Sequence, residues 1–139
     1  MTTEEEVLRN QVQFEIIDQV AWITINNPEK GNAMSPDMRD RMTSLFEALN
    51  GQFAARAVVL TATGQKLFCP GADISVGREY APRPDDAPDL AVGEPRRMML
   101  RGQHPLMSSI LDCELPVIAA VNGTAAGMGA HLALMCDLV

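Results

Sequence analysis

The sequence lacks the features on which nucleic-acid-binding and membrane proteins depend. Its formal net charge is −7 and its pI is about 4.7, so it has no excess of positive charge to attract a phosphate backbone. Its longest apolar runs, such as LPVIAAV and HLALM, are far shorter than the roughly 20 residues that cross a bilayer. We therefore expect a soluble protein that binds neither nucleic acid nor membrane. Lysines and helix N-termini can still hold the phosphates of a large anionic ligand.

Cysteine is scarce, and the N-terminus carries no targeting pattern. The three cysteines, Cys69, Cys113 and Cys136, have no metal-like spacing. Their odd number is typical of reduced thiols in a cytosol-like compartment. The first ten residues, MTTEEEVLRN, are acidic and polar, unlike a signal peptide. These features predict a cytoplasmic protein without a metal site.

Three glycine-based signatures are missing as well. The segment GTAAGMG at 123–129 does not have the G-x-G-x-x-G spacing of a dinucleotide-binding turn. There is no Walker A lysine pattern, and no G-x-S-x-G turn for a nucleophilic serine. Dinucleotide-binding, P-loop and serine-hydrolase functions are therefore disfavoured.

The order of the predicted elements is typical of an α/β protein with parallel crossovers. In the first half of the chain, periodicity and turn residues predict a hairpin of 12–17 and 20–26 around Asp18-Gln19, a helix from Ser35-Pro36 to Asn50-Gly51 and a strand at 56–63. In the second half they predict a helix at 94–113 that breaks at Pro105, a strand at 115–123, a helix at 127–135 and a strand at 136–139. Residues 76–95 hold four of the nine prolines and predict a mobile loop.

Two segments that follow predicted buried strands are rich in glycine and alanine: FCPGADIS at 68–75 and NGTAAGMGAH at 122–131. Small residues let a ligand approach the main chain, and amides at a turn or a helix start are free to donate hydrogen bonds. Two such amides converging on one oxygen would form an oxyanion hole, at roughly 3 kcal/mol per donor. Alternatively, the glycines serve only tight turns and close packing, and glycine content taken alone favours that interpretation.

Three segments in order resemble the successive signatures of the crotonase superfamily, the enoyl-CoA hydratases and isomerases: AWITINNPEKGNAMS at 21–35, FCPGADIS at 68–75 and PVIAAVNGTAAGMGAHLALMCDLV at 116–139. The resemblance extends over residues 10–139. It implies an α/β spiral of β-β-α units, with residues 1–139 forming the N-terminal part of one such domain and the C-terminal part lying beyond it. Members run to about twice this length and assemble as homotrimers or hexamers, so we expect the same of a full-length protein.

The resemblance also implies a ligand, an acyl-CoA thioester, with coenzyme A as part of the substrate and no separate cofactor. Carried onto this chain, the oxyanion hole consists of the main-chain N–H groups of Ala72, after Gly71, and of Met128, after Gly127. The remaining family positions would flank the adenine or meet the CoA phosphates: Lys30, Ala33, Lys66, Asp73 and Ile74. The two lysines can instead be ordinary solvated side chains, and Asp73 can cap the following turn.

The sequence departs from the family pattern at His131. Hydratases of the family carry one catalytic glutamate three residues after the second oxyanion amide, where this chain has His131, and a second about twenty residues later, beyond Val139. His131 can act as an acid or base near neutral pH, or orient a water molecule. It can equally be a hydrogen-bonded structural residue. Glu114 precedes the strand that delivers Met128, so its position does not make it a substitute.

The apolar residues Met98, Met99, Leu106 and Met107 are suited either to an acyl-chain pocket or to the core. The resulting expectation is an acyl-CoA-processing enzyme, a hydratase or an isomerase of fatty-acid or related acyl-CoA metabolism. Hydration by two glutamates is not supported, whereas isomerisation with the oxyanion hole and one later carboxylate stays open. The alternatives are a catalytically silent acyl-CoA-binding paralogue and an oligomerising protein without a ligand.

Overall fold

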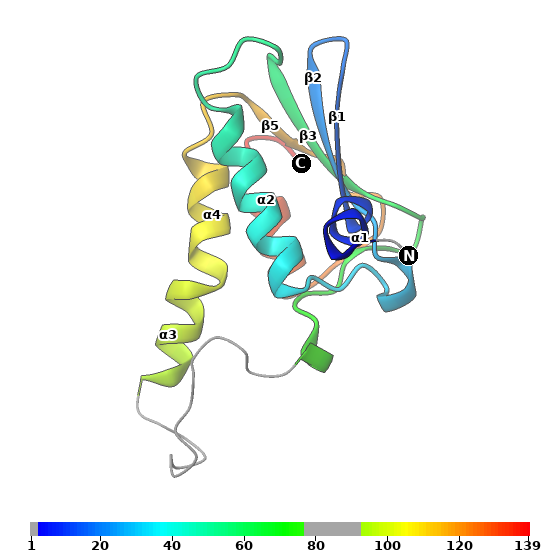
Figure 1. Cartoon of the computed structure of the whole chain (residues 1–139), viewed down its shortest axis with the longest axis vertical. Helices are drawn as coiled ribbons and strands as arrows, with labels where there is room; N and C mark the ends of the chain where they lie inside the picture. Colours follow the sequence, from blue (N-terminus) through cyan, green and yellow to red (C-terminus); the bar gives the residue numbers. More distant parts are fainter. Residues whose placement is uncertain (1–2, 77–92) are drawn as a thin grey trace.

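The computed structural model describes residues 3–76 and 93–139 as two sheets with helices packed over them (Figure 1). The strands are β1 (Val12–Ile17), β2 (Val20–Ile25), β3 (Ala57–Ala62), β4 (Leu67–Cys69), β5 (Val117–Ala119) and β6 (Thr124–Ala125). The helices are α1 (Glu4–Gln11), α2 (Pro36–Leu49), α3 (Glu94–Arg101), α4 (Gln103–Leu111) and α5 (Met128–Leu134), with the 3-10 turns η1 (Pro28–Lys30) and η2 (Ile74–Val76). Most of the loop predicted at 76–95 lies outside the described residues.

The β1–β2 hairpin forms as predicted. Ile17 pairs with Val20 across a two-residue turn in which Asp18 has φ +48° and Gln19 has φ +64°. Two successive positive φ values are those of a type I′ turn, whose twist matches that of the flanking strands.

The strands form two sheets that the chain visits in alternation. The larger sheet has the order β1-β2-β3-β5, parallel apart from the antiparallel β1–β2 pair, and the smaller one pairs β4 with β6 in parallel. Met34 extends the smaller sheet through a parallel bridge to Ala72. Each turn of the chain therefore passes through the large sheet, then the small sheet, then a helix. This repetition confirms the predicted spiral of β-β-α units.

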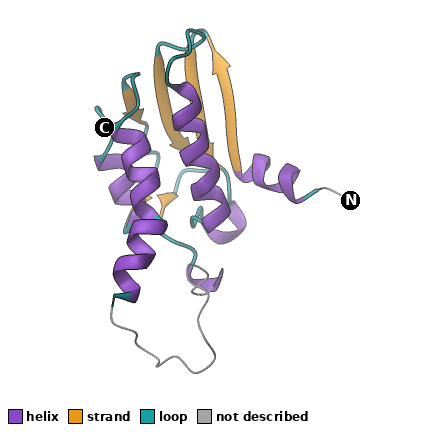
Figure 2. Cartoon of the chain, turned by 60° about the vertical axis from the view of Figure 1, so that its left-hand side comes forward, coloured by secondary structure: helices purple, strands orange, loops and turns teal. Residues whose placement is uncertain are grey.

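The core lies between the larger sheet and the helices α2 and α4, which run side by side over it (Figures 1 and 2). Helix α2 begins where Ser35 accepts a hydrogen bond from the Met38 N–H at 3.2 Å, with Pro36 as its first residue. Its buried apolar side chains are Met38, Met42, Phe46 and Leu49. Each such side chain stabilises the fold by about 2 kcal/mol. No described helix has the length and apolar character to cross a membrane.

The helix predicted at 94–113 breaks at Gly102 and not at Pro105. Pro105 is the third residue of α4, where a backbone N–H would have no acceptor within the helix anyway. Its ring is incompatible with a helical carbonyl four residues earlier, and that residue, Arg101, ends α3. Proline thus interrupts the helix on its own N-terminal side.

Two strand predictions were wrong in extent. The run 115–123 supplies only the three residues of β5, because after Ala119 the chain leaves the larger sheet and enters the smaller one as β6. At 136–139 there is no strand, only a bridge between Leu138 and Ile118. Conversely, β4 and α1 form without having been predicted. Helix α1 begins with a capping box, in which Thr3 and Glu6 each accept the other's backbone N–H.

Candidate active site

The two glycine turns lie against each other at the ends of β4 and β6. Because these strands are parallel neighbours, the residues that follow them emerge at the same edge. A Cβ atom built on Gly71 would lie 3.5 Å from the Ala126 carbonyl oxygen and 3.6 Å from the Met128 nitrogen. Both Gly71 (φ +125°) and Gly127 (φ +52°) have backbone angles that favour glycine. Residues more than fifty positions apart are thus brought into one site.

Each turn presents a main-chain N–H that has no acceptor among residues 3–76 and 93–139. Gly71 O accepts from Met34 N at 2.9 Å, and Asp73 N donates to Met34 O at 2.9 Å, so the intervening N–H of Ala72 points away from Met34. Met128 is the first residue of α5, where an N–H has no acceptor within the helix. Neither N–H group donates to any residue that the structure describes. The two turns therefore offer two free donors side by side.

The two residues that carry these N–H groups differ in burial. Ala72 is exposed, and Met128 is buried, with 3% of its surface accessible, as part of the hydrophobic core. The Met128 side chain thus packs in the core, and its N–H donates to no described residue.

Glycine is required at position 129 because of close packing, and not because of the backbone angles there. A Cβ atom at this position would lie 1.9 Å from the Cys69 carbonyl oxygen, so only glycine lets the first turn of α5 approach the end of β4. At Gly129 the packing interpretation of the glycine-rich segments therefore applies.

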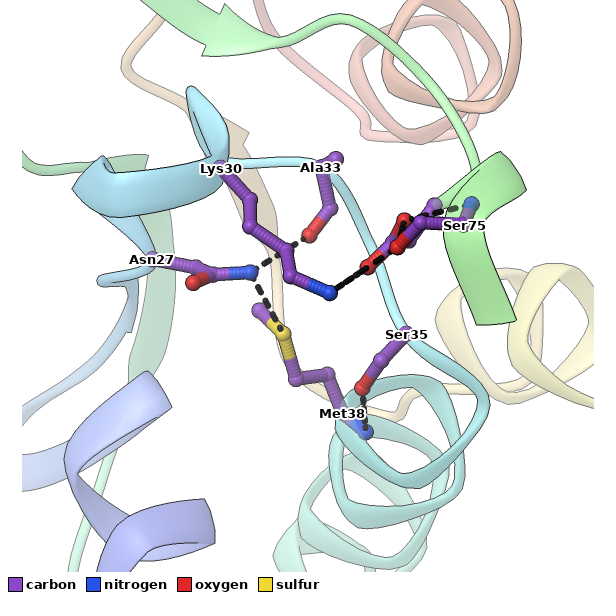
Figure 3. Close-up of polar contacts among 7 residues, drawn as sticks. Asn27, Lys30, Ala33, Ser35, Met38 and Ser75 are labelled. Carbon is purple, nitrogen blue, oxygen red and sulfur yellow. Dashed lines mark hydrogen bonds and ion pairs between the residues drawn. The ribbon is translucent and has the colours of Figure 1, made fainter.

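Lys30, Asp73 and Ser75 form a polar cluster beside the glycine turns (Figure 3). Lys30 Nζ lies 2.6 Å from Asp73 Oδ2 and 3.0 Å from Ser75 Oγ. Asp73 Oδ1 accepts from Ser75 N at 2.9 Å and from Ser75 Oγ at 2.6 Å, so the carboxylate also caps the turn that follows it. The hydrogen bond from Lys30, followed by those from Ser75, lowers the pKa of Asp73 to about 2. Lys30 is thus ion-paired within the chain.

The other predicted CoA contacts are spread around this cluster. Ala33 is half-buried and its carbonyl accepts from Asn27 Nδ2 at 3.0 Å. Ile74 is 95% exposed. Lys66 is exposed in the turn between β3 and β4, at the border of an open cavity of about 390 Å³ between that turn and η1. The structure therefore groups Lys30 with Asp73 and places Lys66 on a different turn.

His131 is exposed on the first turn of α5, three residues after Met128. Its main chain belongs to the helix, with N–H donating to Gly127 O at 3.2 Å. The imidazole makes no hydrogen bond to any described residue. Within the described part of the chain, the imidazole therefore lacks the partner expected of a hydrogen-bonded structural histidine.

Glu114 has a structural role at the opposite end of α2. Its carboxylate accepts from Gly51 N at 2.8 Å, and its own N–H donates to Asn50 Oδ1 at 2.9 Å. Because a helix rises 1.5 Å per residue, the fourteen residues of α2 separate this contact from Ser35 by about 20 Å.

The residues proposed for an acyl pocket do not share one environment. Leu106 is fully buried in the core, Met107 packs against it, and Met99 is 38% exposed. Of Met98 only the backbone is described. Among residues 3–76 and 93–139, no three histidine, cysteine, aspartate or glutamate side chains gather as metal ligands would.

Sequence reasoning missed two buried asparagines, Asn27 and Asn32, which bond to the loops around the site. The one signal that could have indicated them is the polar run of loop residues between β2 and α2.

The spiral of β-β-α units with two free amides at its glycine turns defines a crotonase-type fold, and comparison with known proteins identifies the family. The family model for enoyl-CoA hydratase/isomerase matches residues 15–139. The chain belongs to the enoyl-CoA hydratase/isomerase family.

Individual relatives agree with this assignment. A probable enoyl-CoA hydratase of Rhodobacter capsulatus is 40% identical over 129 residues, which are 92% of this chain and 44% of the relative. A short-chain-enoyl-CoA hydratase of Clostridium acetobutylicum is 35% identical over 129 residues, 93% of this chain and 45% of the relative. The crystal structure of an enoyl-CoA hydratase from Bacillus anthracis superposes with a TM-score of 0.74 at 27% identity, over 91% of this chain and 45% of that one. The chain thus spans less than half the length of these relatives.

Proposed function

We propose that this chain builds the acyl-CoA site of an enoyl-CoA hydratase or isomerase, in which the N–H groups of Ala72 and Met128 stabilise the enolate oxygen of a thioester. The observation that carries the proposal is the contact between Gly71 and Gly127, each followed by a free main-chain donor. A thioester oxygen placed between the donors would accept both hydrogen bonds as negative charge develops on it. Each donor contributes roughly 3 kcal/mol to such a transition state.

The acyl-CoA would reach these amides from the side of the Lys30–Asp73–Ser75 cluster. Lys30, Ala33, Gly71, Asp73, Ile74 and Gly127 are the candidates for contact with the adenine and thioester ends of the ligand. Lys66 is the freer of the two candidate lysines for a phosphate, because its ammonium group makes no hydrogen bond to a described residue, whereas the ammonium group of Lys30 would have to exchange Asp73 for the phosphate. Phosphate and carboxylate are comparable partners for an ammonium group.

His131 is the candidate acid or base. In hydration, a neutral imidazole would accept a proton from water while the water oxygen bonds to the β-carbon and the double-bond electrons move to the thioester oxygen. The imidazolium would then return the proton to the α-carbon as the enolate collapses. One group can thus serve both steps, and the product is the 3-hydroxyacyl thioester.

A second candidate function is binding of acyl-CoA without turnover. It is favoured by one observation: Asp73, the carboxylate that lies beside the glycine turns, is already paired with Lys30 and Ser75. His131, which has no carboxylate partner among the described residues, would then have to supply both proton transfers alone.

The test combines binding with turnover for a series of enoyl-CoA thioesters. Calorimetry measures affinity, and loss of the conjugated-thioester absorbance measures hydration. Affinity with turnover supports the enzyme, and affinity without turnover supports the silent paralogue. No affinity for any CoA ester would contradict both and favour a protein that only associates with other chains.

The family resemblance extends the proposal to fatty-acid or related acyl-CoA metabolism in the cytoplasm and to a homotrimer or hexamer. Light scattering of the purified protein measures the mass of the assembly, and a monomer at all concentrations would contradict the oligomeric part.

A further inference from the structure

Asn32 is a buried polar residue in the loop that carries Lys30 and Ala33. Only 3% of its surface is accessible. Its φ is +63°, in the left-handed region, which asparagine tolerates better than most residues with a side chain. A buried amide in an unfavourable backbone conformation persists only where surrounding contacts hold it.

Those contacts join two loops that are distant in sequence. Asn32 Oδ1 accepts from Asn27 N at 3.0 Å, within its own loop. Its Nδ2 donates to Thr63 O at 3.0 Å and to Leu67 O at 2.9 Å, at the two ends of the turn between β3 and β4. Both amide hydrogens and the amide oxygen are therefore bonded, and the asparagine fixes one loop onto the other.

The same two loops determine where the Ala72 amide points. Leu67 begins β4, which leads through Cys69 to Ala72. Two residues after Asn32, Met34 bonds to Gly71 and Asp73 on either side of Ala72. A shift of the Asn32 loop along β4 would carry Met34 with it and turn the Ala72 N–H.

We propose that Asn32 is a positioning residue of the acyl-CoA site: it sets the register between the two loops and so aims the Ala72 N–H at the thioester oxygen. It does not touch the substrate. The inference rests on the proposed function, and it assigns a role to a residue beyond the donors themselves.

Asn32→Asp is the main test variant. Aspartate has the same shape, tolerates the same backbone angle and keeps the acceptor for Asn27, but it replaces the donor with an oxygen facing the carbonyls of Thr63 and Leu67. The readout is the infrared stretching frequency of a ¹³C-labelled thioester carbonyl in an enoyl-CoA bound to the full chain, because hydrogen bonds to the carbonyl oxygen lower that frequency. We expect the variant to lose most of the lowering seen in the unsubstituted protein, and turnover to fall at least tenfold.

Two further variants separate positioning from stability. Asn32→Gly accepts the positive φ without strain and adds no charge, so it should lose the frequency shift as well; it replaces Asn32→Asp if that variant does not fold. Asn50→Ala is the matched control, since Asn50 also bonds to two main-chain groups, Asp112 O at 3.2 Å and Glu114 N at 2.9 Å, but at the other end of α2. It should keep the full frequency shift.

The outcomes distinguish the two proposals. If the unsubstituted protein binds enoyl-CoA without lowering the carbonyl frequency, the oxyanion hole is wrong and the Asn32 inference falls with it. If the unsubstituted protein shows the shift and a folded Asn32 variant retains all of it, the oxyanion hole stands and the role assigned to Asn32 is overturned.

Discussion

Lys30 and Asp73, 43 positions apart in the sequence, form a 2.6 Å ion pair that joins the loop after β2 to the turn after β4. Half of the Lys30 side chain is exposed, whereas only 6% of the Asp73 side chain is. Asp73 directly follows Ala72 in the chain, so the pair links the candidate CoA-binding lysine to the segment that carries the candidate oxyanion amide. Under the proposed function, recognition of the CoA end and stabilisation of the thioester end would depend on the same short segment.

The ion pair predicts a pH-dependent contribution of Asp73 to stability. Its pKa is lowered to about 2, so its contribution is fully present above the unfolded-state value of about 4 and is lost as the pH falls toward 2. We expect Asp73→Asn to unfold at lower urea concentration than the unsubstituted protein at pH 7, with the difference shrinking between about pH 4 and pH 2. A difference that stayed constant down to pH 2 would contradict this assignment.

Glu5→Gln is the matched control for that experiment. Glu5 pairs with Arg9 at 2.6 Å on the surface of α1, with 73% of its side chain exposed. Exposed helical pairs of this kind contribute only about 0.3–0.5 kcal/mol, so the control should change the unfolding midpoint little.

Removal of one main-chain donor should affect turnover more than binding. Ala72→Pro eliminates the N–H, and loss of one oxyanion donor typically lowers kcat by about 10² to 10³. Affinity for free CoA should change much less, because CoA lacks the thioester oxygen. Ala72→Gly keeps the N–H and should retain turnover. Steady-state kinetics and calorimetry on both variants test this, and an active Ala72→Pro protein would show that the donor is elsewhere.

Gly129→Ala should destabilise the fold strongly. The new methyl group would meet the Cys69 carbonyl oxygen at 1.9 Å, and overpacking in a rigid core costs about 3 kcal/mol. The control is Gly51→Ala, where φ is +71° but nothing lies within 4 Å, so only backbone strain of about 1 kcal/mol is added. Urea unfolding compares the two; equal losses would mean that α5 can move away from β4.

His131 should control the pH dependence of turnover if it is the acid or base. His131→Ala is expected to lower kcat by about 10² to 10⁴ and to alter the pH profile of the rate, because a general acid or base must be in the correct protonation state. The protein's other histidine, His104, is exposed on α4, and His104→Ala should leave both unchanged. An active His131→Ala protein with an unaltered profile would leave the residue without a catalytic role.

Apart from α1, whose capping box was overlooked, the locally encoded helices and the hairpin could be predicted from the sequence, whereas the extent of elements that depend on distant partners could not. The hairpin and α2 follow from alternation, turn residues and the Ser35-Pro36 cap. Strand β4 has only three residues and is defined by its pairing with β6, which lies more than fifty positions away. The run 115–123 reads as one apolar strand because periodicity does not indicate where the chain leaves one sheet for another.

The site shows the same division. Glycine content indicated tight turns at 71 and 127 and left open whether their amides converge, the family resemblance favoured convergence, and only the structure brings the two turns into contact. Asn32 could not be predicted, because its role depends on carbonyls 31 and 35 positions away.

The most direct test of the central claim is an NMR titration of ¹⁵N-labelled protein, once with an enoyl-CoA thioester and once with free CoA. The amide resonances of Ala72 and Met128 are the signals that report on the result. The account predicts that the thioester moves both amide protons downfield, as expected for new hydrogen bonds to an oxygen, and that free CoA does so far less. If both resonances responded equally to the two ligands, or not at all while the thioester was bound, these amides would not form the oxyanion hole.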